Sequence, residues 1–317
     1  MALFLRDEEV TKCVSMPDML DAIEAMQRHF GKGEAYNLAR RKIIAPGGLL
    51  AIMGGGLLYD GVLGVKTYTV VKGKYSFHVS LYDAETGALL CYSQANRLGQ
   101  LRTGATTGVA AKYLSKQDAA TVGIIGTGNQ ALTQLEALKA TRGVKRVKAF
   151  SRTPERREAF ARTASEALGL EVTAAESAEA AVRDTDVVVC VAATMEPVVQ
   201  GEWLSGGSTL IAAGPTTWRA REVDDAALAR ASRFVTDSIE QAPGEAGDLA
   251  SAVDRGLLQW SQLEELRHVV AGKATGRGNR DEVIYAKLQG TGVADLAAAK
   301  LAYDNARAQG LGTELDF

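Results

Sequence analysis

Residues 119–131 read AATVGIIGTGNQA, and this stretch decides the fold. The apolar run Val122–Ile125 is followed by Gly126-Thr-Gly-Asn-Gln-Ala131, and leucines then recur at helical spacing. This is the order of a strand, a phosphate-binding turn and a helix. Gly126 would allow the tight turn, and Gly128 would let backbone amides approach a pyrophosphate. The stretch predicts a dinucleotide site that includes the following residues: Gly126, Thr127, Gly128, Asn129 and Gln130.

The sequence around the turn supports this interpretation, because a glycine-rich turn alone also occurs where a loop only has to bend. Residues 144–150 read as the next strand, which completes a βαβ unit. The pattern then alternates between helices and short apolar strands. The expected helices are 154–168 and 177–183, and the expected strands are 171–173, 186–191, 209–213 and 234–236. Alternation of this kind predicts a doubly wound parallel sheet.

Length and composition limit the function classes. The 317 residues suit two domains of ordinary size, and a net charge of −2 gives no broad basic field for nucleic acid or an anionic membrane. Three widely spaced cysteines suit buried thiols in a reducing compartment, and the three histidines have no partner at metal-ligand spacing. No apolar run reaches 18 residues. We expect a cytoplasmic protein without a metal, a nucleic-acid partner or a membrane partner.

The N-terminal part has a different pattern. After a short strand at residues 3–5, Ser15 and Pro17 indicate the start of a helix that extends to Phe30, with Met19, Ile23 and Met26 on its inner face. Residues 39–92 then read as short strands separated by glycine-containing turns, which predicts one mixed or antiparallel sheet. A helix at 98–114 leads into the dinucleotide domain. The apolar face of a last helix, 294–307, needs cover, and we expect it to dock on the first domain.

The end of the second strand of the βαβ unit indicates which dinucleotide is preferred. An NAD site usually presents an acid there to the ribose 2′-hydroxyl, whereas this chain has Ser151, Arg152 and Thr153. Hydroxyl groups and a guanidinium can hold a 2′-phosphate. The alternative is a solvated basic start of a helix. We expect NADP as the cofactor, with NAD as the second choice.

Cationic residues of the first domain are candidate ligands for an anionic substrate: Arg40, Arg41, Lys66 and Arg102. Lys66 lies within an apolar strand, where a buried charge is costly unless it meets an anion, so a substrate carboxylate is a reasonable partner. The alternative is an exposed position on the other face of the strand. Arg102 begins a helix of small residues and could either reach a substrate or cap a surface.

Ordered motifs along nearly the whole chain resemble those of the ornithine cyclodeaminase and mu-crystallin family. They are Arg41, Gly64-Val-Lys66, Asp83-Ala-Glu-Thr-Gly87, Arg102-Thr103-Gly-Ala, Gly126-Thr-Gly-Asn-Gln-Ala131, Gly201-Glu-Trp203, Gly214, Arg221-Glu222-Val-Asp224 and Lys287-Leu-Gln-Gly290. The resemblance implies an α/β fold, in which a Rossmann domain with a doubly wound parallel sheet accompanies a smaller α+β domain. The smaller domain would comprise residues 1–115 plus 291–317, bind the substrate and form a homodimer through its sheet, and the Rossmann domain would comprise residues 116–290.

The resemblance also implies chemistry on an imine of an α-amino acid. Arg41, Lys66 and Arg102 would hold the substrate carboxylate, with Lys66 close to the reacting nitrogen. The enzyme would be an NAD(P)-dependent oxidoreductase acting on C=N or CH–NH bonds. It would reduce a small imino acid (a ketimine) to an L-amino acid, or catalyse the reverse oxidative deamination.

One position departs from part of the family. Cyclodeaminases and the related alanine dehydrogenases carry an aspartate two residues after the glycine that ends the 209–214 strand, and this chain has Thr216. A threonine is no ordinary base near neutral pH, although its hydroxyl can hydrogen-bond an imine nitrogen or a water. We therefore expect Thr216 to assist imine reduction. The alternatives are a lyase that releases ammonia and a dinucleotide-binding protein without catalysis.

Overall fold

The computed structural model describes residues 1–316, and the chain divides into two compact units. Unit 1 comprises Met1–Ala105 and Gly290–Phe317, and unit 2 comprises Thr106–Gln289. The first division lies inside one continuous helix, α3 (Asn96–Leu114). It therefore precedes the boundary at residue 115 that the resemblance implied.

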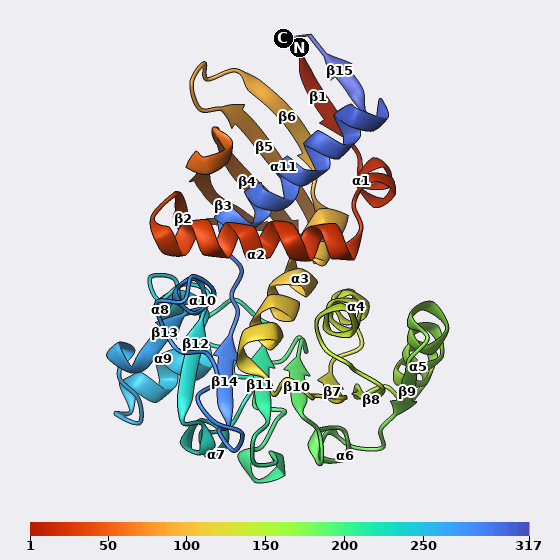
Figure 1. Ribbon diagram of the computed structural model, residues 1–317, viewed down its shortest axis with the longest axis vertical. Coiled ribbons are helices and arrows are strands. Elements are labelled where there is room, and N and C mark those ends of the chain that lie inside the picture. Colours follow the sequence, from red (N-terminus) through yellow and green to blue (C-terminus); the bar gives the residue numbers. More distant parts are fainter. Residues whose placement is uncertain (317) are drawn as a thin grey trace. The chain divides into compact units, whose positions relative to one another are not determined.

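Unit 1 contains a seven-stranded sheet (Figure 1). In spatial order its strands are β15 (Thr313–Leu315), β1 (Ala2–Leu5), β6 (Leu89–Gln94), β5 (Lys74–Asp83), β4 (Val62–Val71), β3 (Gly48–Leu57) and β2 (Ala35–Ala45). Strands β1 and β6 are parallel, and the other neighbours are antiparallel. The expected mixed sheet is thereby confirmed. A 3-10 turn, η1 (Leu58–Asp60), connects β3 to β4.

Helices cover this sheet. Helix α2 (Met16–Lys32) begins at Ser15, whose hydroxyl accepts the Asp18 N–H, and ends at Gly33 with a φ of 86°. The inner residues predicted for this helix are buried. Helix α11 (Gly292–Gln309) packs against β2 to β5 and beside α2, as Figure 1 shows, so the expected docking of the last helix on the first unit is confirmed. The sequence pattern did not predict the short helix α1 (Asp7–Cys13).

Unit 2 contains an eight-stranded sheet in which every neighbouring pair is parallel. In spatial order its strands are β13 (Leu263–Glu265), β12 (Arg233–Thr236), β14 (Ile284–Lys287), β11 (Thr209–Ala212), β10 (Val187–Cys190), β7 (Thr121–Ile125), β8 (Arg146–Phe150) and β9 (Glu171–Ala174). The predicted doubly wound parallel sheet is confirmed (Figure 1).

Short helices and turns connect the strands of unit 2. They are α4 (Ala131–Thr141), α5 (Pro154–Leu168), α6 (Ala178–Val182), η2 (Gly201–Trp203), α7 (Asp225–Arg230), α8 (Ala242–Glu245), α9 (Gly247–Asp254), η3 (Trp260–Gln262) and α10 (Leu266–Val270). The expected strands 171–173, 186–191, 209–213 and 234–236 correspond to β9, β10, β11 and β12. The sequence pattern missed β13 and β14, although β14 lies inside the sheet between β11 and β12.

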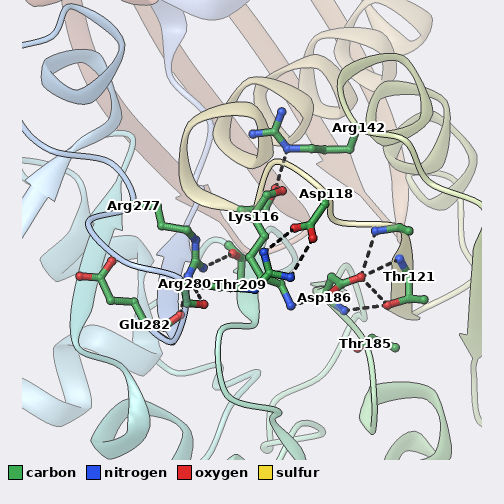
Figure 2. A network of polar contacts seen from close by, with 12 residues as sticks. Lys116, Asp118, Thr121, Arg142, Thr185, Asp186, Thr209, Arg277, Arg280 and Glu282 are labelled. Atoms are coloured by element: carbon green, nitrogen blue, oxygen red, sulfur yellow. Dashed lines mark hydrogen bonds and ion pairs between the residues drawn. The ribbon is translucent and has the colours of Figure 1, made fainter.

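A polar network lies at the amino ends of the parallel strands (Figure 2). The Asp186 carboxylate accepts the backbone N–H groups of Ala120 and Thr121 at 2.9 and 3.0 Å, and the Thr121 hydroxyl at 2.7 Å. Lys116 Nζ lies 2.7 Å from the same carboxylate. Partial burial would raise the pKa of Asp186, but Lys116 and these donors lower it to about 2. Asp186 therefore ties the start of β7 to the start of β10.

Replacing Asp186 with asparagine should destabilise the protein at pH 7 by about 1–2 kcal/mol, allowing for screening at a partly exposed site. The folded-state pKa lies below the unfolded value, so this stabilisation is present above about pH 4 and is lost as the pH falls towards about 2. Urea unfolding of both proteins at several pH values measures the difference. Asp118→Asn, which removes an exposed pair with Arg280, is the control and should change stability little. An Asp186→Asn deficit that is independent of pH would contradict the assignment.

Two further observations concern the sequence expectations. All three cysteines are buried and free of disulfides. Within residues 1–316, no helix is long and apolar enough to cross a membrane.

Candidate active site

A buried ion cluster joins the two chain segments that form unit 1. Lys66, in the middle of β4, is 3% exposed, and its Nζ donates to Asp295 Oδ1 at 2.7 Å. Arg102 on α3 is 8% exposed, and its Nε donates to the same oxygen at 2.8 Å. Asp295, in the first turn of α11, is fully buried. The structure thus brings Lys66 and Arg102 together, and the alternative of an exposed position for Lys66 is wrong.

Strand β2 contributes Arg40 to this cluster. The register between β2 and β3 shifts between Leu38 and Arg41, so that two residues of β2 lie opposite Met53. Arg40 Nε lies 3.2 Å from the Met53 sulfur, and Met53 is the direct partner of Lys66 across β3 and β4. Directly paired residues share a face of the sheet. Arg40 therefore lies on the Lys66 face, and its charge acts on Lys66.

Arg41, which we expected beside Lys66, lies elsewhere. It pairs with Ile52, the neighbour of Met53, and successive residues of a strand point to opposite faces. Arg41 is accordingly exposed, on the face opposite Lys66. The bulge places Arg40, and not Arg41, on the face of the sheet that carries Lys66. Arg41 therefore does not contribute to the cluster of Lys66 and Arg102.

The charges of the cluster shift the pKa values of Lys66 and Asp295. Burial lowers the pKa of Lys66 to about 8, with Arg102 and Arg40 acting in the same direction and Asp295 opposing them. Burial would raise the pKa of Asp295, but Arg102 and Lys66 outweigh it and hold that pKa below its usual range. Lys66 and Asp295 are thus held as an ion pair in a buried site.

Glycine at position 290 lets the backbone approach Arg102. A Cβ added there would lie 2.6 Å from Arg102 Nη1, and the φ of 80° also disfavours other residues. The Gly290 carbonyl accepts from Arg40 Nη2 at 3.3 Å. The segment before α11 thereby contacts both arginines of the cluster.

The glycine turn of unit 2 has the geometry that a dinucleotide site requires. Gly126 has a φ of 102°, and a Cβ on it would lie 2.8 Å from the backbone of Val191 and Ala192. A Cβ on Gly128 would meet no atom of the described residues within 4 Å, so a phosphate can approach this backbone. Helix α4 begins directly after the turn, at Ala131. The positive dipole end of this helix suits a pyrophosphate, and the residues present therefore fit this group.

The predicted ribose-binding residues follow β8 and meet the turn. Thr127 Oγ1 donates to Ser151 Oγ at 2.8 Å, and the Gly126 N–H donates to the carbonyl of Phe150 at 2.8 Å. Arg152 and Thr153 are exposed, and Thr153 is the N-cap residue of α5. Thr127 and Ser151 are thus brought together beside an exposed arginine.

Thr216 lies half-buried in the loop after β11. At the start of this loop the Gly214 N–H donates to both carboxylate oxygens of Glu222, at 3.1 and 3.2 Å. Further along, Thr217 forms a parallel bridge with Ala246, and the Trp218 N–H donates to the Gly244 carbonyl at 3.0 Å. The loop that carries Thr216 is therefore held at several points.

A second buried ion cluster lies beneath this loop. Lys287, at the end of β14, donates to Glu222 and lies 3.4 Å from Asp248 Oδ2, and all three side chains are at most 1% exposed. Asp248 Oδ1 accepts the N–H groups of Glu222 and Val223 at 2.7 and 3.0 Å. Burial would lower the pKa of Lys287, but the two carboxylates raise it. Lys287 thus remains charged and links the end of β14 to the loop.

Sequence reasoning missed Asp295 as a member of the unit 1 cluster, and it named Arg40 as a candidate but gave the role beside Lys66 to Arg41. Asp295 is an acid next to Leu296 on the apolar face of the last helix. An acid at such a position was the signal that could have predicted its membership of the cluster. An acid there needs a cation, just as Lys66 within an apolar strand needs an anion. The sequence had no signal to choose between Arg40 and Arg41, because the bulge in β2 decides which of them faces Lys66.

Comparison with known proteins identifies the family. The sequence model of the ornithine cyclodeaminase/mu-crystallin family matches residues 2–310. The chain belongs to this family. The resemblance of the motifs is thereby confirmed over nearly the whole chain.

Several family members are similar over their full length. The solved structure of Thermococcus litoralis Δ1-pyrroline-2-carboxylate reductase, in complex with NADH and L-proline, has a TM-score of 0.94 and 30% identity, covering 99% of this chain and 100% of that one. An archaeal alanine dehydrogenase dimer with bound NAD also has a TM-score of 0.94 and 30% identity, covering 100% and 99%. The iminosuccinate reductase of Paracoccus denitrificans is 31% identical over 99% of this chain and 100% of its own length.

Proposed function

We propose that this family member is an NAD(P)H-dependent reductase of a small imino acid, forming an L-amino acid or oxidising it in reverse. The observation that carries the proposal is the buried cluster in which Lys66 and Arg102 share Asp295 Oδ1 and the charge of Arg40 acts on Lys66. Buried guanidinium and ammonium groups of this kind suit the carboxylate of an α-imino acid. The similar proteins are a Δ1-pyrroline-2-carboxylate reductase, an iminosuccinate reductase and an alanine dehydrogenase, and each is named for an imino or amino acid.

The proposed roles follow from the chemistry of each group. Arg102 and Arg40 would bind the substrate carboxylate, and Arg40 takes the place that the sequence had assigned to Arg41. Lys66 would donate a proton to the imine nitrogen, since its pKa of about 8 lets it give up a proton near neutral pH. A bound nicotinamide cofactor supplies the hydride. The carboxylate contacts would orient the C=N bond for the transfer.

We propose that Thr216 hydrogen-bonds the imine nitrogen or a water. Its hydroxyl is neutral near pH 7 and cannot replace the aspartate that the resemblance implies for cyclodeaminases. The contacts of Gly214 and Thr217 would hold the loop that carries it. This favours reduction over a lyase reaction that releases ammonia.

The face of the sheet around Lys66 supports a substrate with an apolar side chain. By strand register, Tyr68 and Phe77 share that face, and Lys66 Nζ lies 5.4 Å from the Phe77 ring centroid. The Tyr68 and Phe77 rings are 5.2 Å apart. These rings suit an alkyl or cyclic substituent better than a second carboxylate. We therefore propose a cyclic or alkyl imino acid in preference to a dicarboxylic one.

NADPH oxidation followed at 340 nm across a panel of imino acids tests the proposed function. The panel should contain cyclic imines, 2-oxo acids with ammonia or methylamine, and a dicarboxylic member. We expect turnover with cyclic or alkyl members and little with the dicarboxylic one. Tight dinucleotide binding without oxidation of any member would favour a binding protein, and strict preference for the dicarboxylic member would overturn the substrate class.

We propose NADPH as the preferred cofactor, with NADH second. The support is the contact of Ser151 with Thr127 and the exposed Arg152 and Thr153 that follow Ser151, with no carboxylate among these four residues. The two solved relatives contain NAD or NADH, so the coarser assignment to a nicotinamide dinucleotide has independent support. Preference between the two rests on residues 151–153 of this chain.

Arg152→Ala should raise KM for NADPH about tenfold or more and leave KM for NADH nearly unchanged, because the lost contact is to the 2′-phosphate alone. Initial rates with each cofactor give the comparison. Arg162→Ala, an exposed arginine farther along α5, is the matched control. Equal changes for NADPH and NADH would refute the role of Arg152.

We propose a homodimer that forms through the outer face of the unit 1 sheet. By register, five exposed residues share this face: Tyr36, Leu38, Ile43, Leu63 and Tyr82. An exposed apolar surface of this kind is typical of an interface between copies. The archaeal alanine dehydrogenase is a dimer, which supports a second copy as the partner.

Leu38→Glu should shift the protein towards a monomer, because a charge would be buried at the centre of the proposed interface. Leu38 is 55% exposed, and Leu257 in unit 2 is 58% exposed, so Leu257→Glu is a matched control. Analytical ultracentrifugation gives the masses. A Leu38→Glu protein that keeps the oligomeric state of the wild type would exclude this face.

We also propose the cytoplasm as the compartment, on the support of three buried cysteines without disulfides.

A further inference from the structure

Asp295 contacts two cations through one atom. Its Oδ1 accepts from Lys66 Nζ at 2.7 Å and from Arg102 Nε at 2.8 Å. Because β4 and α3 supply these cations from separate parts of unit 1, the shared oxygen fixes the distance between them. The carboxylate is fully buried, so solvent does not weaken either contact.

The packing of α11 fixes the place of this carboxylate. The helix begins at Gly292, where a Cβ would collide with the backbone of Gly54 on β3. This close contact holds the first turn of the helix against the sheet. Asp295 lies in that turn, where the helix dipole favours a negative charge.

The charges around Lys66 explain why an anion is needed there. The groups that act on Lys66 are Asp295 from α11, Arg102 from α3 and Arg40 from β2. The two arginines and burial disfavour a charged lysine, and Asp295 favours it. A neutral residue at 295 would leave the lysine buried among positive charges.

We propose that Asp295 is a positioning residue, which holds Arg102 and Lys66 in place and keeps the Lys66 ammonium charged for the reaction. This inference rests on the proposed imine reduction for its catalytic consequence. The geometry on which it stands is independent of the substrate.

Asp295→Asn tests the role through the titration of Lys66. NMR of the protein labelled with 13C at lysine side chains, with Lys66→Met for assignment, follows that group without a substrate. We expect the midpoint to fall by about one pH unit or more, because the opposing anion is lost. The descending limb of the kcat pH profile should move by the same amount, and kcat should fall more than tenfold. Asp304→Asn, which removes the exposed partner of Lys300 on the same helix, should change neither.

Asp295→Glu separates charge from position and provides a second test if the asparagine variant does not fold. It keeps the anion and moves it by one methylene, so the Lys66 midpoint should remain within about half a pH unit while kcat falls. An unchanged Lys66 midpoint and unchanged kcat in Asp295→Asn would overturn the inference. If the wild type reduces no imino acid, the proposed function fails, and the NMR titration still decides the role of Asp295.

Discussion

Lys66→Met should lower kcat/KM for imino-acid reduction about a thousandfold, which corresponds to about 4 kcal/mol of transition-state stabilisation. The side chain combines two proposed contributions, an attraction for the substrate carboxylate and a proton for the imine nitrogen. Methionine keeps the length of the side chain in a strand that is buried at this position and removes only the charge and the proton. Steady-state kinetics with the best substrate of the panel measure the loss.

The pH dependence of the wild-type activity is a second test of the role of Lys66. Since the pKa of Lys66 is about 8, activity that needs the protonated amine should fall as the pH rises through that value. Lys74→Met, an exposed lysine on β5, should leave both rate and profile unchanged. Near-normal kcat/KM in Lys66→Met would remove this residue from the mechanism.

Lys287→Met should lower the free energy of unfolding of unit 2 by about 3–5 kcal/mol. The substitution leaves Glu222 and Asp248 buried without their cation, and Glu222 also holds the Gly214 N–H at the start of the Thr216 loop. All three tryptophans lie in unit 2, so their fluorescence during urea unfolding reports on this unit.

Lys300→Met provides the matched comparison. Lys300 pairs with Asp304 at the surface of α11, and loss of an exposed pair costs at most about 1 kcal/mol. A Lys287→Met protein as stable as Lys300→Met would show that the buried cluster does not stabilise unit 2.

The features that the sequence predicted well are local ones. The glycine turn, its preceding strand and the start of α4 follow from residues within one short stretch. Gly126 has the positive φ for which a glycine was predicted there. The docking of α11 also followed from a local pattern, since an apolar helix face must be covered. Lys66 was informative for the same reason, because a charge within an apolar strand needs a partner.

The features that the sequence did not predict depend on contacts between distant segments. The partner of Lys66 lies 229 residues away on α11, and no local pattern links the two. The bulge in β2 decides between Arg40 and Arg41, and it arises from pairing with β3. Strand β14 has four residues, too few for a periodic pattern, and becomes a central strand only through β11 and β12.

The stoichiometry of one reaction tests the central claim most directly. The purified protein is incubated with a cyclic imino acid such as Δ1-pyrroline-2-carboxylate and NADPH, and the consumed cofactor, the L-amino acid and ammonia are all measured. The proposed function predicts one equivalent of NADPH oxidised for each L-amino acid formed, with no ammonia. The opposite result, no net oxidation with this substrate together with ammonia release from a diamino acid, would contradict it and identify a lyase.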